Sequence, residues 1–198
     1  MSEIKVNKVS PATGTDVTLG DSGDTFTVPS GATIVNSGPA TGFGGGKINQ
    51  VQSPQITDTE TTTSTSFVEI PTLQVTITPS ATDSVIMLTC NLSLGMTSNS
   101  HGLLQLFRDT TQVGMGDVAG DRGRTILAWR SNLDALTYSA WNNPYQWVDD
   151  PASTSAITYS MKWRVNTGTG YLGRSGGDTD NDNNNRSPCS MAAWEILA

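Results

Sequence analysis

The stretch Ile157–Asn166, ITYSMKWRVN, decides the fold class, because apolar and polar residues alternate through it without a break. The apolar side chains all fall two positions apart, at Ile157, Tyr159, Met161, Trp163 and Val165. A period of two is typical of a β-strand with one face in a core and the other in water. The stretch therefore predicts an antiparallel strand over residues 156–166.

A second stretch, Val85–Leu94, is richer in apolar residues. One face carries Ile86, Leu88, Cys90, Leu92 and Leu94. The opposite face adds Val85 and Met87. A strand with apolar residues on both faces is typical of the middle of a sheet, so we expect this strand to be central and covered on both sides.

Further short strands are expected between turns rich in Pro, Asp, Asn and Gly. They are Ser66–Ile70, Leu73–Thr78, Leu103–Arg108, Thr125–Arg130 and Ser190–Leu197. Trp163 and Trp194 lie in strand register and are predicted to be in the core. Many short antiparallel strands predict an all-β fold, with a jelly-roll-like antiparallel β-sandwich over residues 56–198.

The N-terminal stretch Val17–Ile34, VTLGDSGDTFTVPSGATI, has strand chemistry but too few apolar residues to bury itself. Further copies of the chain would supply the missing surface. Residues 1–37 are therefore predicted to be a β-rich attachment and stalk region of a homotrimer, followed by a Gly-rich linker over residues 38–55. The expected stalk core is Leu19, Phe26, Val28 and Ile34, and the expected attachment strand is Ile4, Val6 and Val9.

Charge and hydropathy exclude several classes of function. Charged residues make up 15% of the 198-residue chain, and the formal net charge is -7. Nucleic-acid binding needs clustered Lys and Arg, so no nucleic-acid partner is expected. The sequence has neither the apolar core of a signal peptide nor an apolar run of membrane-span length, so we expect synthesis in a cytoplasm without export or membrane insertion.

Four passages of the sequence resemble a known family. They are DSGDTFTVPSGATIVNSGPATGFG (residues 21–44) and TTTSTSFVEIPTLQVTITPSATDSVIMLTCNLSLG (residues 61–95), together with LLQLFRDTTQVGMGD (103–117) and YSMKWRVNTGTGYLGRSGGDTDN (159–181). They are similar to tail-fibre and virion-fibre structural proteins of tailed bacteriophages, especially those of cyanobacteria and marine bacteria. The resemblance implies a homotrimeric virion component whose N-terminus joins the particle and whose distal β-domain meets the host surface.

The loop DTDNDNNN, residues 178–185, alternates carboxylates and amides as a calcium loop does. Asp178, Asp180 and Asp182 are its candidate ligands. The loop departs from the EF-hand pattern, with Asn183 where Gly is usual and Cys189 where the bidentate Glu belongs. The alternative is an exposed polar hairpin loop.

The segment AWNNPYQWVDDP, residues 140–151, places Trp141, Tyr145 and Trp147 among amides and carboxylates. Such rings suit stacking on saccharides or contact with a surface protein, so these three residues are receptor-contact candidates in a predicted loop. The alternative is that the rings pack between subunits or cap the sandwich.

Enzyme chemistry has little support, since the sole histidine, His101, has no evident nucleophile beside it. No cofactor motif is present. Cys90 is predicted to be a buried free thiol, with a bridge to Cys189 as the alternative. The sequence therefore predicts a non-enzymatic trimeric fibre on a virion, with a host glycan or protein as partner. A capsid-decorating protein is the alternative, and an enzyme that degrades envelope polysaccharide ranks last.

Overall fold

The computed structural model describes residues 9–11, 13–15, 17–18, 21–25, 27–33, 47–97, 99–131 and 138–197. Within these ranges the regular structure is β, with no α-helix. The chain divides into two units, residues 1–43 and residues 44–198. Each is described by itself, and the second unit is called the head.

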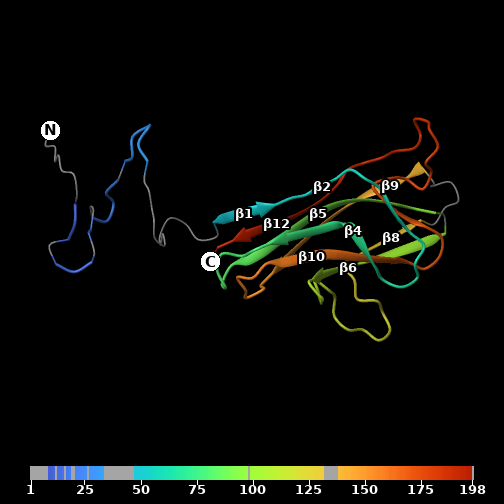
Figure 1. Ribbon diagram of the computed structural model, residues 1–198, viewed down its shortest axis with the longest axis horizontal. Coiled ribbons are helices and arrows are strands. Elements are labelled where there is room, and N and C mark those ends of the chain that lie inside the picture. The colour runs from blue at the N-terminus through green and yellow to red at the C-terminus, as the bar shows by residue number, and fades with distance from the viewer. Residues whose placement is uncertain are drawn as a thin grey trace. The chain divides into compact units, whose positions relative to one another are not determined.

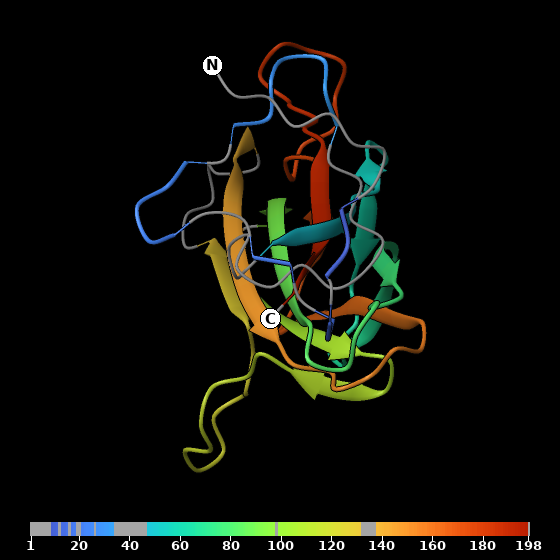
Figure 2. The same ribbon diagram turned by 90° about the vertical axis from the view of Figure 1, so that its left-hand side faces the viewer.

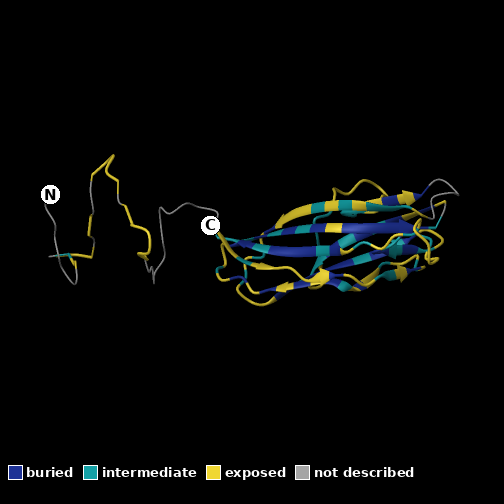
Figure 3. Cartoon of the chain, turned by 90° about the horizontal axis from the view of Figure 1, so that it is seen from above, coloured by how far each residue is buried: buried dark blue, intermediate teal, exposed yellow. Residues whose placement is uncertain are grey.

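The described residues of the first unit form turns and no strand, so the predicted β-strands of the stalk are not seen in the single chain. The backbone N–H of Asp24 donates to the carbonyl of Asp21, and that of Ala32 donates to the carbonyl of Pro29. Most of these residues are exposed, as Figure 3 shows in yellow. This is what turn-rich sequence with few apolar residues does when no partner surface is present.

The head consists of two antiparallel sheets (Figure 1). The seven-stranded sheet contains β1 (Ile48–Gln52), β2 (Gln55–Ile56), β3 (Glu60–Thr62), β5 (Val85–Met96), β9 (Ala140–Asp149), β11 (Gly170–Leu172) and β12 (Cys189–Ile196). The five-stranded sheet contains β4 (Val68–Ile77), β6 (Ser100–Arg108), β7 (Thr111–Val113), β8 (Leu127–Ser131) and β10 (Ile157–Val165). Because β1 belongs to the head, the predicted linker over residues 38–55 is too long at its C-terminal end.

The strand order confirms a jelly roll. Among the described residues the longer strands form nested antiparallel pairs: β1 with β12, β4 with β10, β5 with β9, and β6 with β8. In one sheet β12 and β5 lie between β1 and β9, and in the other β10 and β6 lie between β4 and β8. Figure 2 shows β9 in orange, β5 in green and β12 in red side by side. A long hairpin wound over itself produces this nesting.

The core lies between the sheets, and β10 supplies its largest members. Tyr159, Met161 and Trp163 are buried as the alternation predicts. The ring of Trp163 stacks on Trp129 of β8 with centroids 6.3 Å apart. In β5 every second residue from Ile86 to Met96 is buried. The period-two pattern therefore predicted the inward faces of β5 and β10 correctly.

Two predictions about strands need correction. The separate strands Ser66–Ile70 and Leu73–Thr78 are one strand, β4, which runs through Pro71. Proline is tolerated there because β4 is at the edge of its sheet and the pairing with β10 shifts register at this point. Trp194 is not in the core. It lies on the outer face of its sheet, where its Nε1 donates to Thr89 Oγ1 at 3.0 Å.

Candidate functional site

The predicted aromatic loop is an edge strand, β9, so the prediction of a loop over residues 140–151 is wrong. Alternation along β9 places Trp141, Tyr145 and Trp147 on the face that looks toward the other sheet, since Trp147 lies opposite the buried Leu88. Six residues of strand separate Trp141 from Trp147, about 20 Å at the usual rise. The three rings form a row rather than one cluster.

Tyr145 and Trp147 pack against the turn that follows β7. Gly114 has a φ of 62° there, and an added Cβ would lie 2.5 Å from the Tyr145 Oη. The Oη donates to the Gly114 carbonyl at 3.3 Å. Burial, with a smaller effect of Cys90, raises the pKa of Tyr145 to about 12. This geometry favours the packing interpretation for these two rings, although Trp147 keeps 38% of its surface exposed.

Replacing Trp147 by Ala is expected to lower the free energy of unfolding by about 1 to 2 kcal/mol, part of the cost for a fully buried ring. The reason is that the Trp147 ring lies against Gly114, and alanine removes this contact. Thermal unfolding should show the loss, and Asn142→Ala, at an exposed position on the opposite face of β9, is the control. Unchanged stability together with slower adsorption to host cells would favour a receptor contact instead.

The two ends of the head differ in character. The chain enters at Lys47 and leaves at Leu197, whose N–H donates to the Lys47 carbonyl at 3.0 Å, so both lie at one end. The turn between β5 and β6 and the long connection before β12 lie at the opposite end, here called the far end (Figure 1). Trp141 also lies toward the far end, since it pairs with Leu94. Trp147 lies toward the end at which the chain enters.

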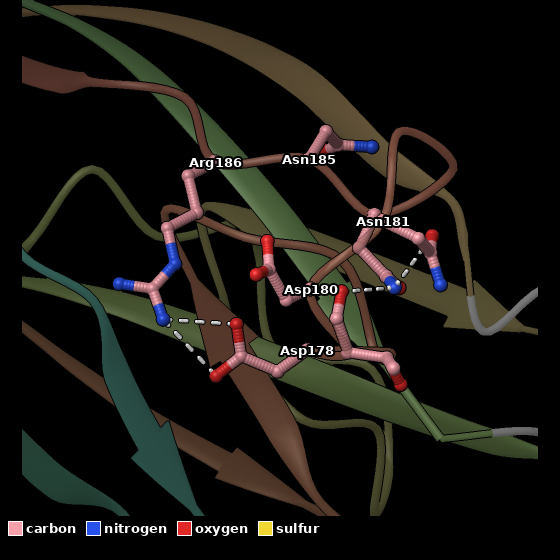
Figure 4. A pocket seen from close by; sticks show the side chains of 7 residues that line it. Asp178, Asp180, Asn181, Asn185 and Arg186 are labelled. Carbon is pink, nitrogen blue, oxygen red and sulfur yellow. Dashed lines mark hydrogen bonds and ion pairs between the residues drawn. The ribbon is translucent and has the colours of Figure 1, made fainter.

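A polar hollow of about 430 Å³ opens in the far-end connection (Figure 4). It is lined by Asp178, Thr179, Asp180, Asn181, Asn184, Asn185 and Arg186. Two Asn side chains organise it. The Asn184 Nδ2 donates to the Thr179 carbonyl at 2.8 Å, and the Asn185 Nδ2 donates to the Tyr138 carbonyl at 3.0 Å. The hollow presents amide, carboxylate and guanidinium groups to solvent, a donor and acceptor set that fits a hydroxyl-rich ligand.

The carboxylate of Asp178 is held by arginine. Arg186 Nη2 lies 2.9 Å from Oδ1 and 3.1 Å from Oδ2, and Figure 4 shows both contacts. The hydrogen bond from Arg186 holds the pKa of Asp178 below its usual value, and the positive charge of Arg174 adds to this effect. Arg174 and Arg186 flank the Asp-rich run in sequence, which is the signal that could have predicted the pair.

The predicted calcium ligands do not gather. Among the described residues, which include Asp178, Asp180 and Asp182, no three His, Cys, Asp or Glu side chains come together in a way that could hold a metal ion. Asp178 instead faces the guanidinium of Arg186. The loop is a polar connection in this conformation, which is the alternative that the sequence left open.

The cysteines are both buried and free, so the predicted free thiol at Cys90 is confirmed and the bridge to Cys189 is not formed. Burial raises the pKa of Cys90 to about 12 and also raises that of Cys189. Both thiols are therefore protonated at neutral pH and are poor nucleophiles. The His101 side chain is exposed, and its backbone N–H donates to Asn166 Oδ1 at 2.7 Å.

The N-terminal candidates are only partly described. Val9 is 63% exposed and Val28 is 38% exposed. The other predicted attachment and stalk-core residues, Ile4, Val6, Leu19, Phe26 and Ile34, lie outside the described residues. The described part of the chain contains no helix of the length and hydropathy that a membrane span requires.

Comparisons with known proteins give only distant likenesses. No family model and no curated protein matches the chain. The VP2 subviral particle of infectious bursal disease virus is 12% identical with a TM-score of 0.36, over 75% of this chain and 38% of that one. The structure of T=1 particles derived from infectious bursal virus is 14% identical with a TM-score of 0.35, over 81% of this chain and 41% of that one. This chain spans about two fifths of the length of those chains, and TM-scores this low carry no argument.

Proposed function

We propose that the chain is a non-enzymatic virion structural protein, a trimeric fibre that joins the particle through its N-terminus and presents the far end of its head to the host surface. The observation that carries the proposal is that the two ends of the head differ. The chain enters at Lys47 at one end, and the polar hollow opens at the other. A tether at one end leaves the far end free to meet a partner. The resemblance to virion fibres supports the same arrangement.

The far end suits a weak polar contact. The hollow lined by Asp178 and Arg186 is open, and Tyr138, whose side chain is 52% exposed, is joined to it through Asn185. Of the three predicted receptor residues, Trp141 lies toward this end. A host glycan or surface protein would make few contacts with each head, and three heads on one stalk would add avidity through effective concentration.

The described residues offer little to an enzyme. Both thiols are buried with raised pKa values. The far-end hollow pairs its Asp178 carboxylate with Arg186, which lowers the pKa and makes that carboxyl a poor proton donor at neutral pH. These features support binding rather than catalysis.

Trimer formation is tested through Phe26, a predicted residue of the stalk core. Phe26→Asp should raise the apparent dissociation constant of the trimer by about 100-fold or more, because a charge placed in an apolar interface is desolvated without a partner. Sedimentation velocity of the purified full chain measures the change. Thr27→Asp is the matched control, because successive side chains of a strand point to opposite faces and Thr27 would point away from the stalk core. A wild-type chain that sediments as a folded monomer would contradict the proposal.

Localisation tests the role on the particle. Gold-labelled antibodies against the head should mark the distal parts of fibres in electron micrographs of intact virions. Purified full chain should also compete with particles for adsorption to host cells. Label spread over the capsid shell would favour the capsid-decorating alternative. Turnover of purified host polysaccharide by the chain would favour the enzyme.

A further inference from the structure

The outer face of the seven-stranded sheet carries a row of large apolar side chains that crosses four strands. Val51 pairs with Trp194, Trp194 with Met87, and Met87 with Val148. Val51 is 40% exposed and Val148 is 50% exposed. A shorter parallel row consists of Ile48, Ile196 and Val85. These seven residues are called the apolar face.

The sequence predicts that β5 is covered on both sides, and the outward residues behind that prediction, Val85 and Met87, belong to the apolar face. The inward residues of β5, such as Leu88, are fully buried. Its outward residues Val85 and Met87 remain partly exposed in the single chain. Apolar residues on both faces of a central strand are typical of a strand with a second covering layer. The described residues of one chain do not supply that layer at this end.

The outward positions of β1, β5, β9 and β12 bear no ionisable side chain among the described residues. Besides the apolar face they hold small or amide residues, namely Ser190, Ala192, Thr89, Asn91, Ser93, Asn142, Pro144 and Gln146. The other sheet differs, since its outer face carries Glu69, Lys162 and Arg164. Two copies of a chain of net charge -7 repel each other, and an uncharged face is where they approach at the least electrostatic cost.

The apolar face lies at the end of the head where the chain enters. Ile48 directly follows Lys47, and Ile196 precedes Leu197, whose N–H bonds to Lys47. In an oligomer joined through residues 1–46, these ends of the heads are the parts held closest together. The tether therefore brings copies of this face near one another.

The size of the apolar face distinguishes a contact between tethered heads from a contact between free heads. Four strands at about 4.8 Å spacing and three residues of strand length, Val85 to Met87, give a face of roughly 20 Å by 10 Å. A stable interface between free proteins buries about 800 Å² on each partner, which is more than this face offers. Tethering supplies the remainder as effective concentration. The face is thus too small to hold free heads together, and a contact through it depends on the shared stalk.

We propose that the apolar face of each head packs against a second copy of the head within the oligomer. This inference rests on the proposed trimer. It makes the heads a compact cluster at the stalk end while their far ends stay free.

Cysteine alkylation on the full chain tests the contact. Val148→Cys places a thiol on the apolar face, and Gln74→Cys places a matched thiol at an exposed position on the other sheet. The native thiols are buried and contribute little background. We expect maleimide to react about tenfold more slowly at position 148 than at position 74, because a packed thiol reacts only on local opening. Adding Phe26→Asp should abolish this protection.

The outcomes separate the two proposals when sedimentation is run on the same samples. Protection at position 148 in a trimer supports the inference. A trimer in which both thiols react equally fast overturns the inference and leaves the fibre intact. A wild-type monomer overturns both. Protection that persists in the Phe26→Asp variant supports contact through the heads and overturns the stalk as the source of assembly.

Discussion

Replacing Glu195 by Gln is expected to lower the free energy of unfolding of the head by about 3 kcal/mol at pH 7. Glu195 is a fully buried carboxylate at the end of β12. It accepts hydrogen bonds from Asn49, Gln50, Ser80 and Ser84. The Gln amide carries a donor where the carboxylate carries an acceptor, so some of these donors lose their partner.

A β-bulge makes this cluster. The register of β1 shifts between Ile48 and Gln50, so that Asn49 and Gln50 both reach Glu195 on the inner side. Ser80 and Ser84 come from the turn between β4 and β5. The carboxylate therefore ties the first strand of the head, the last strand and a turn together.

The same cluster predicts how stability depends on pH. Burial alone raises the pKa of Glu195, but the hydrogen bonds from Asn49, Gln50 and Ser80 outweigh it and bring the pKa down from 4.5 to about 2. A lowered folded-state pKa stabilises the fold above the unfolded-state value and loses that effect as the pH falls. Wild type should therefore lose about 3 kcal/mol between pH 5 and pH 2 that Glu195→Gln does not lose.

Urea unfolding followed by tryptophan fluorescence at several pH values measures both effects. Glu69→Gln, the same chemical change at an exposed position of β4, is the control and should change stability by less than about 0.5 kcal/mol. Equal acid sensitivity of wild type and Glu195→Gln would contradict the prediction.

Replacing Asp149 by Ala is expected to cost about 3 kcal/mol, because it breaks the polar contact that joins the two sheets. Asp149 ends β9 and is almost fully buried. Its Oδ2 accepts from Tyr159 Oη at 2.7 Å and from Arg108 Nη1 at 2.9 Å. Both partners belong to the five-stranded sheet. Alanine leaves the buried Tyr159 hydroxyl without this acceptor.

A double-mutant cycle with Tyr159→Phe isolates the contact. Burial and the hydrogen bond to Asp149 raise the pKa of Tyr159, so the phenol stays protonated well into alkaline pH. Once the hydroxyl is gone, Asp149→Ala should cost less, with a coupling energy of about 1 kcal/mol or more. Asp150→Ala, whose carboxylate accepts only from the N–H of Ala152 among the described contacts, is the matched control. Additive losses would show that the two side chains act independently.

The candidate site was less predictable than the fold. Residues 140–151 are rich in aromatics and amides, as the sequence predicts, and the alternation typical of β10 is also present in β9. Trp141, Asn143, Tyr145, Trp147 and Asp149 fall two apart, on the face directed toward the other sheet. Pro144 made the segment resemble a loop, yet proline is compatible with an edge strand. Whether a strand lies at an edge depends on pairing between distant segments.

The sequence by itself determined most of the longer strands, the inward faces of β5 and β10 and the sandwich class, because period-two alternation is a local property of each strand. It also determined that Cys90 would be buried, since that residue shares a strand face with Leu88 and Leu92. The tertiary structure alone decided the nested pairing, the burial of Glu195 and Asp149, and the outward position of Trp194. Each of these depends on which strands become neighbours across long sequence separations, and the alternation within one strand does not encode that choice.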